Sequence, residues 1–156
     1  MTVSTSRSRQ SEAGQPVTDE SGDLAEKMIR GSKGDIAERK LIPDDARVLK
    51  YTVSRALERG DLDVVVLTGG TGVSTTDVTI ESVRPFFEKE IEGFGELFRA
   101  VSYEKIGAAA ALSRATAGVI KGKLIMCLPG SPDAVSTALA LFLGEVPHVV
   151  QLARGV

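Results

Sequence analysis

The stretch VVVLTGGTGVSTTD, residues 64–77, changes from an apolar run into a glycine-rich turn and ends on a carboxylate. The run alternates too little between apolar and polar residues for a strand with one wet face, so we expect a central strand covered on both faces. Ligands of open parallel sheets bind beyond the carboxyl ends of the strands. The stretch therefore predicts a parallel sheet and a ligand site where the glycines begin.

Apolar and amphipathic segments alternate along the whole chain, which is typical of a parallel sheet flanked by helices. We expect strands at residues 2–4, 35–42 and 62–68, and a hairpin of residues 117–120 and 123–130 around Lys121 and Gly122. Helical patterns cover residues 19–31, 44–60, 78–91, 102–115 and 131–145, with a kink at Pro85. Residues 6–18 are predicted to be a long polar loop, residues 91–99 an irregular passage, and residues 131–145 the last regular element.

The chain of 156 residues is 42% hydrophobic and carries a formal charge of -2, which suits a single domain spanning residues 1–156. The weak net charge provides no broad basic surface, so nucleic acid is not an expected partner. No apolar run approaches the roughly 18–20 residues of a membrane span, and the start lacks the apolar core of a secretory signal. We therefore expect a cytoplasmic protein that binds small molecules and no membrane.

Cys127 and His148 are the only residues of their kinds. Cys127 lies in the apolar run LIMCL and is expected to be a buried thiol. A histidine-based metal site or a Ser-His-Asp triad would have to rest on His148 alone, which we do not expect to be catalytic. Chemistry should therefore come from carboxylates, hydroxyls, backbone amides and a metal ion.

The glycine-rich turn after residue 68 suits an anion. Glycine permits positive φ and close approach of a ligand, and successive backbone N–H groups ahead of a helix form a phosphate site. The turn lacks the lysine of a P-loop and the third glycine of the dinucleotide fingerprint. The alternative is a turn that only redirects the chain. A similar device recurs in LPGSPDAV, residues 128–135, where Ser131 should cap a helix that Pro132 begins.

Asp77 and Asp44 each follow an expected strand and precede a helix. Either could be a helix N-cap, which contributes about 1 kcal/mol, although Asp45 competes with Asp44 for that role. A carboxylate about 4 Å from a phosphate charge is repelled by about 4 kcal/mol at an effective dielectric near 20, whereas Mg2+ between them reverses the sign. The alternative to capping is therefore a metal-bridged phosphate, shared by both aspartates if the ends of the second and third strands are neighbours.

These motifs resemble those of the MoaB/MogA family of molybdenum cofactor biosynthesis, with MoaB the closer branch. The resemblance rests on GGTG and the following Asp, then GFGE, LSR and LPGSP in that order, and extends from TVSTSR and IPDD over nearly the whole chain. It implies a three-layer α/β/α sandwich around a mostly parallel sheet. It also implies a homo-oligomer, either a trimer or a hexamer.

The resemblance further implies that the protein binds molybdopterin and ATP, adenylylates the molybdopterin phosphate with Mg-ATP, and releases pyrophosphate. Asp44 and Asp77 match the family's acids associated with catalysis and are candidates to hold Mg2+, with Glu96 a third acid. The residues that match the binding pocket are Thr68, Gly69, Gly70, Thr71, Gly72, Ser113, Pro129, Gly130 and Ser131. Adenylylated molybdopterin would then pass to an enzyme that inserts molybdenum.

The chain departs from this family just before the aspartate: many relatives carry two arginines there, whereas this chain has Thr75 and Thr76. Arg7, Arg9 or Arg114 could then supply the phosphate contact. Alternatively, the protein is a non-catalytic module that binds molybdopterin or a partner of the same pathway. Hydrolysis of a nucleotide pyrophosphate is a third hypothesis.

Overall fold

The computed structural model describes residues 1–5 and 18–156 of the chain. They form a six-stranded sheet with the order β2-β1-β3-β6-β5-β4. The strands are β1 (Thr2–Thr5), β2 (Arg39–Ile42), β3 (Val64–Thr68), β4 (Lys89–Glu90), β5 (Thr116–Ile120) and β6 (Lys123–Leu128). The predicted polar loop lies outside the described residues except for its last residue, and so do Arg7 and Arg9.

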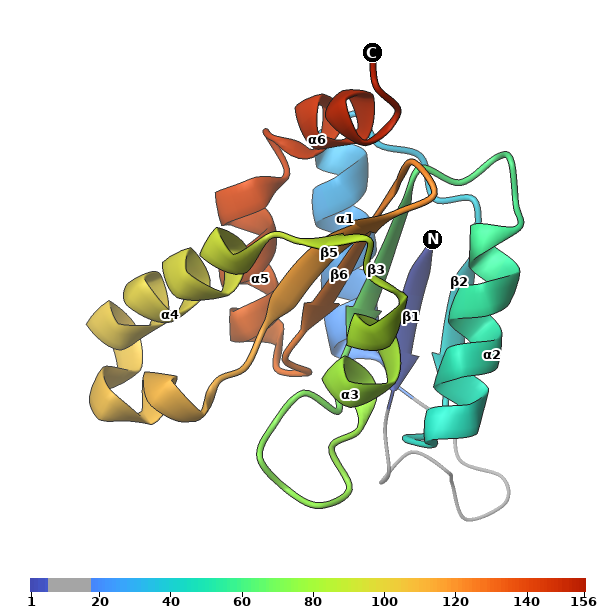
Figure 1. Ribbon diagram of the computed structural model, residues 1–156. Coiled ribbons are helices and arrows are strands. Elements are labelled where there is room, and N and C mark those ends of the chain that lie inside the picture. The colour runs from blue at the N-terminus through green and yellow to red at the C-terminus, as the bar shows by residue number, and fades with distance from the viewer. Residues whose placement is uncertain (6–17) are drawn as a thin grey trace.

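Helices cover both faces of this sheet (Figure 1). They are α1 (Glu20–Gly31), α2 (Ala46–Leu57), α3 (Thr79–Val83), α4 (Glu92–Ile106), α5 (Pro132–Phe142) and α6 (Val146–Ala153), with short 3-10 helices η1 (Arg84–Phe86) and η2 (Gly107–Leu112). Buried residues of α2 and α3 share one apolar cluster with the sheet, and those of α1, α4, α5 and α6 share a second. The predicted α/β/α sandwich is therefore confirmed.

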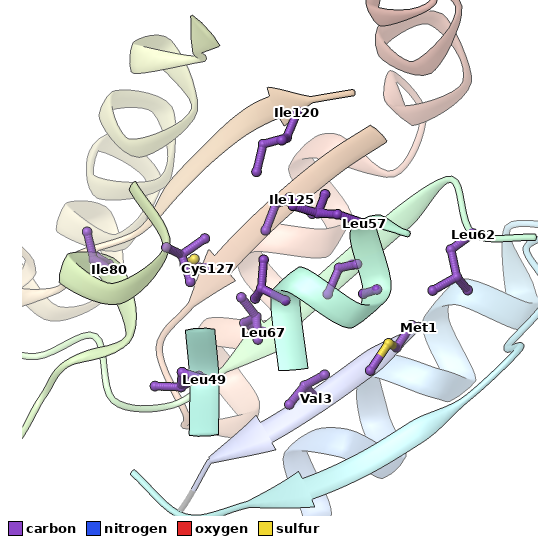
Figure 2. Packing of buried hydrophobic residues seen from close by; sticks show 14 residues of the cluster. Met1, Val3, Leu49, Leu57, Leu62, Leu67, Ile80, Ile120, Ile125 and Cys127 are labelled. Atoms are coloured by element: carbon purple, nitrogen blue, oxygen red, sulfur yellow. The ribbon is translucent and has the colours of Figure 1, made fainter. Parts of the chain in front are cut away.

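The central strand β3 lies between β1 and β6 and is parallel to both. Its Val65 and Leu67 belong to the cluster beneath α2 and α3, whereas Val66 belongs to the opposite cluster. Figure 2 shows the first cluster, in which Leu49 of α2 packs in the same group as Leu67. Because the three β3 side chains are at most 2% exposed, the strand is covered on both faces, as its lack of alternation predicts.

Cys127 belongs to the same cluster and is fully buried (Figure 2). Burial raises the pKa of its thiol well above the ordinary value, because the thiolate would lose its hydration. The predicted buried thiol is thus confirmed.

The hairpin predicted around Lys121 and Gly122 joins the antiparallel pair β5 and β6. Both turn residues have positive φ, 49° and 73°, as a tight two-residue turn between twisted strands demands. The sheet is therefore mostly parallel, with β5 running against β6 and β4 against β5.

Residues 92–99 are not irregular, as the sequence suggested, but form the first half of α4. Phe94 and Phe98 are spaced i, i+4 and are both buried against the second cluster. Their burial outweighs the low helix propensity of Gly93 and Gly95.

Other segments also differ from expectation. The helix expected at residues 102–115 breaks at Gly107, where φ is 59°, and only the 3-10 helix η2 follows. The helix expected at residues 78–91 ends at Val83, and Lys89 and Glu90 pair with β5 as an edge strand. Residues 131–145 are not the last element, because α6 follows and carries the exposed His148. The elements β4 and α6 have only two and eight residues, and so short a segment shows too little periodicity to be recognised from the sequence.

Within the described residues, no single helix is long and apolar enough to cross a membrane. Only α5 and α6 taken together would meet that length and composition, and the pair is bent by 66° at its junction.

Candidate active site

The loop after β3 and the turn after β6 both leave the sheet at the carboxyl ends of these parallel strands (Figure 1). The N–H of Gly69 donates to the carbonyl of Leu128 at 2.9 Å, which joins the two chain segments directly. Glycine is required here, since Gly69 and Gly70 have φ of 97° and 62°. A Cβ on Gly69 would lie 2.6 Å from the carbonyl oxygen of Thr5, at the end of β1. The ends of β1, β3 and β6 therefore meet around the GGTG loop.

The adjacent residues Asp44 and Asp45 make different contacts. Asp45 caps α2, accepting from the N–H groups of Arg47 at 2.8 Å and Val48 at 3.1 Å. Asp44 is not the cap, and its Oδ1 lies 2.9 Å from the position that a Cβ on Gly70 would take. The structure thus places the carboxylate of Asp44 against the glycine loop.

Asp77 is not a helix cap either. The N-cap of α3 is Val78, which makes no side-chain cap. Asp77 instead closes its own loop, because its Oδ2 accepts from the N–H of Ser74 at 2.9 Å. The same oxygen lies 2.7 Å from the position of a Cβ on Gly72. Asp44 and Asp77 therefore border the GGTG loop at Gly70 and Gly72.

The two aspartates do not lie at the ends of neighbouring strands, although the sequence led us to expect that. The strands that precede them, β2 and β3, are not neighbours, because β1 lies between them. The two aspartates border one loop because that loop reaches across the end of β1, where Gly69 meets Thr5.

Hydroxyl groups surround Gly70 beside Asp44. The Oγ1 atoms of Thr5 and Thr79 are buried and have no hydrogen-bond partner among the described residues. A Cβ on Gly70 would lie 2.6 Å from Thr79 Oγ1 and 3.3 Å from Thr5 Oγ1. Nothing in the local sequence signals these two threonines, since only the strand order brings β1 and α3 to the loop.

The other predicted site residues lie around the same loop. Thr68 is buried in β3 and donates to Ser4 Oγ at 3.1 Å, so it joins β3 to β1. Ser131 caps α5 through the N–H of Ala134 at 3.3 Å, as predicted. A Cβ on Gly130 would lie 3.0 Å from Gly69 Cα, so the turn of residues 129–131 packs directly on the glycine loop.

The residue after Ser113 contacts the glycine loop. Ser113 is half-buried at the end of η2, and the next residue, Arg114, donates from Nε to the carbonyl of Thr71 at 2.8 Å. Ser21 of α1 donates to the carbonyl of Gly130 at 2.6 Å, a contact that the sequence did not indicate. Glu96 is exposed on α4.

The donors around the loop suit a hard cation rather than a soft one. Among the described residues there is no group of three or more His, Cys, Asp or Glu side chains that could hold a metal. Asp44 and Asp77 offer carboxylate oxygens, and Thr5 and Thr79 offer buried hydroxyls. Such a set fits Mg2+, which binds one or two carboxylates and completes its shell with substrate phosphate and water.

A glycine loop bordered by two aspartates at the carboxyl ends of a doubly covered sheet defines a class of α/β proteins with a polar ligand site at the strand ends. The family described as a probable molybdopterin binding domain matches residues 1–148 of this chain. The chain therefore belongs to this MoaB/MogA molybdopterin-binding family.

Proteins of known name agree with this membership. A protein of Methanocaldococcus jannaschii named probable molybdopterin adenylyltransferase is 41% identical over 150 residues, covering 96% of this chain and 89% of that protein. The molybdopterin adenylyltransferase of Pyrococcus furiosus is 47% identical over 119 residues, covering 74% of this chain and 69% of that protein.

Solved structures share the whole fold. A crystal structure of molybdenum cofactor biosynthesis protein B superposes with a TM-score of 0.89 at 36% identity, covering 99% of this chain and 94% of that one. The tungsten cofactor synthesizing protein MoaB from Pyrococcus furiosus has a TM-score of 0.86 at 41% identity, with 98% and 94% covered.

Proposed function

We propose that this protein is a molybdopterin adenylyltransferase that uses ATP. The observation that carries this proposal is the glycine loop of residues 69–72, which lies between Asp44 and Asp77 at the strand ends. The names of its relatives in two archaea support the same activity. In the reaction, an oxygen of the molybdopterin phosphate attacks the α-phosphorus of ATP, the bond from that phosphorus to the β-phosphate oxygen breaks, and pyrophosphate leaves.

The protein's own contribution is placement and charge. The backbone N–H groups of residues 70–72 and the N-terminus of α5 would donate to phosphate oxygens. Asp77 and Asp44 would hold Mg2+, which when bound neutralises the charge of the pyrophosphate that leaves. Holding both reactants in line accounts for much of the rate enhancement in such transfers.

The non-catalytic hypothesis has one observation in its favour. Thr75 and Thr76 are exposed on the loop before Asp77, and Thr76 shares a 3.0 Å hydrogen bond with Ser74. Neutral hydroxyls at these positions bring no positive charge to two anionic substrates. A module that only binds molybdopterin would have no need of ATP, so nucleotide binding separates the two hypotheses.

The first test is titration calorimetry with ATP in the presence and absence of Mg2+, followed by assay of AMP transfer to molybdopterin. Mg2+-dependent ATP binding and transfer are expected of the native protein, with both lost in Asp77→Asn. Asp61→Asn is the matched control, since Asp61 is exposed and pairs with Arg59 just before β3, at the opposite end of that strand. Folded protein that binds molybdopterin but not ATP would instead establish the non-catalytic module.

Self-association is also part of this proposal. Four exposed large apolar residues lie on the contiguous α4 and η2: Leu97, Tyr103, Ile106 and Leu112. An exposed group of this kind suits a surface that is covered in an oligomer. The product, adenylylated molybdopterin, would be consumed by a metal-insertion enzyme. The cytoplasmic location that the sequence favours stays a prediction.

A further inference from the structure

The glycine loop is held at three consecutive residues by three different parts of the chain. The N–H of Gly69 donates to Leu128 of β6, and the carbonyl of Gly70 accepts from the N–H of Thr79 at 2.9 Å. The carbonyl of Thr71 accepts from Arg114 Nε at 2.8 Å. The first two anchors are backbone groups, so Arg114 is the anchor that a side-chain substitution can remove.

Arg114 is itself held in place. Its Nη1 donates to Glu81 Oε1 of α3 at 2.6 Å, in an ion pair between partly exposed side chains. The hydrogen bond from Arg114 is the largest influence on Glu81 and lowers the pKa of its carboxyl. At this exposure an ion pair adds little to global stability, so its consequence is mainly the direction of the guanidinium.

The pair joins three segments that carry site residues. Glu81 lies four residues after Asp77, Arg114 follows Ser113, and Thr71 lies inside the glycine loop. Thr71 is only 2% exposed, so its peptide is firmly enclosed. A shift of Arg114 would therefore change where the loop N–H groups lie relative to Asp77 and Ser113.

We propose that Arg114, oriented by Glu81, is a positioning residue that fixes the Thr71 peptide and hence the phosphate-binding geometry of the GGTG loop. This assigns Arg114 a role different from the direct phosphate contact considered from the sequence. Its guanidinium already donates to a carbonyl and a carboxylate, and the planar fork of arginine makes both contacts at once. A lysine has a single terminal nitrogen, so it cannot place separate nitrogens against the Thr71 carbonyl and the Glu81 carboxylate as the guanidinium does. The effect on turnover rests on the proposed adenylyl transfer, whereas the effect on the loop does not.

The hydrogen bond from Arg114 to the Thr71 carbonyl, with Arg114 oriented by Glu81, is called the clamp below. Hydrogen exchange of the loop amides tests this clamp and does not require an activity assay. Backbone amides of residues 69–73 are followed by mass spectrometry in the ligand-free native protein and in Arg114→Lys and Glu81→Gln. Faster exchange confined to this segment, with an unchanged urea midpoint, is expected in both variants. Arg30→Lys is the matched control, because Arg30 forms an exposed pair with Glu26 at 2.8 Å on α1 and does not contact the loop. Unchanged loop exchange in Arg114→Lys would overturn the clamp.

Kinetics then test the positioning role. For AMP transfer, kcat/KM should fall about tenfold or more in each variant, carried mainly by kcat, and the double variant should be no slower than Arg114→Lys alone. If Arg114 instead bound phosphate directly, Glu81→Gln would release it and tighten ATP binding, which would overturn the proposal. Faster loop exchange with unchanged turnover would do the same. A native protein without AMP transfer would refute the proposed function, and the exchange measurement would still decide the clamp.

Discussion

Gly70 is the residue on which the site geometry depends most directly. Its φ of 62° lies in the left-handed region, and the space beside its Cα is taken by Thr79 Oγ1 and Asp44 Oδ1. Any other residue at this position would have a strained backbone, and its side chain would clash with Asp44, which we propose binds the metal ion. The glycine thus has a conformational and a steric reason to be present.

Replacement of Gly70 by alanine should therefore reduce both stability and activity. We expect unfolding to become easier by about 1–3 kcal/mol, the usual range for a non-glycine residue held in an unfavourable backbone conformation, and Mg2+-dependent ATP binding to weaken. Urea unfolding and calorimetry measure the two effects. Gly93→Ala in α4 is the control, because a Cβ there meets nothing within 4 Å and φ is not positive. Equal behaviour of the two variants would contradict the assignment.

At the scale of elements, the N-terminus of α2 holds two adjacent aspartates: Asp45, which caps the helix, and Asp44, for which we propose a role in catalysis. Asp45→Ala removes the cap and should destabilise the protein by about 1 kcal/mol, while AMP transfer by the folded enzyme stays near that of the native protein. Asp44→Asn should leave the urea midpoint nearly unchanged and abolish most of the transfer. The same two assays on both variants check this, and the reverse pattern would show that the roles are exchanged.

Asp19, the N-cap of α1, should make the stability of the protein depend on pH. Burial alone would raise the pKa of Asp19, but hydrogen bonds from Ser4, the N–H of Gly22 and Arg39 outweigh it, and the pKa lies below the ordinary value of 3.8. A depressed pKa means that the ionised form stabilises the fold, fully above the unfolded pKa, and that this stability is lost as the pH falls through the folded value. Urea midpoints measured from pH 6 down to pH 3 should therefore fall less steeply in Asp19→Asn. Parallel profiles would contradict this.

At the scale of the whole molecule, the exposed apolar residues of α4 and η2 predict association between copies. Leu97→Asp should shift the proposed oligomer towards monomer in light scattering after gel filtration, because a buried unpaired carboxylate is strongly unfavourable. Leu152→Asp on α6 is the control, since that leucine is equally exposed, 63% against 58%, but lies outside the proposed surface. An unchanged mass for Leu97→Asp would place the interface elsewhere.

Much of the fold follows from local patterns. A few residues of sequence were enough to predict three features correctly. These are the unbroken apolar run of β3, the tight turn at Lys121 and Gly122, and the start of α5 at Ser131 and Pro132. Each works because the cause of the structure, a backbone angle, a cap or a stretch covered on both faces, lies in the same short segment.

The sequence by itself determined the central strand, the glycine loop and the candidate aspartates, and, through resemblance, the family. Tertiary structure alone decided that β1 separates β2 from β3, that Asp45 rather than Asp44 caps α2, and that Phe94 and Phe98 make a helix of a glycine-containing segment. It also decided that Arg114 clamps Thr71, 43 residues earlier in the chain. The physical reason is that such contacts depend on strand order and on which faces become buried, and neither is encoded in the periodicity of a single segment.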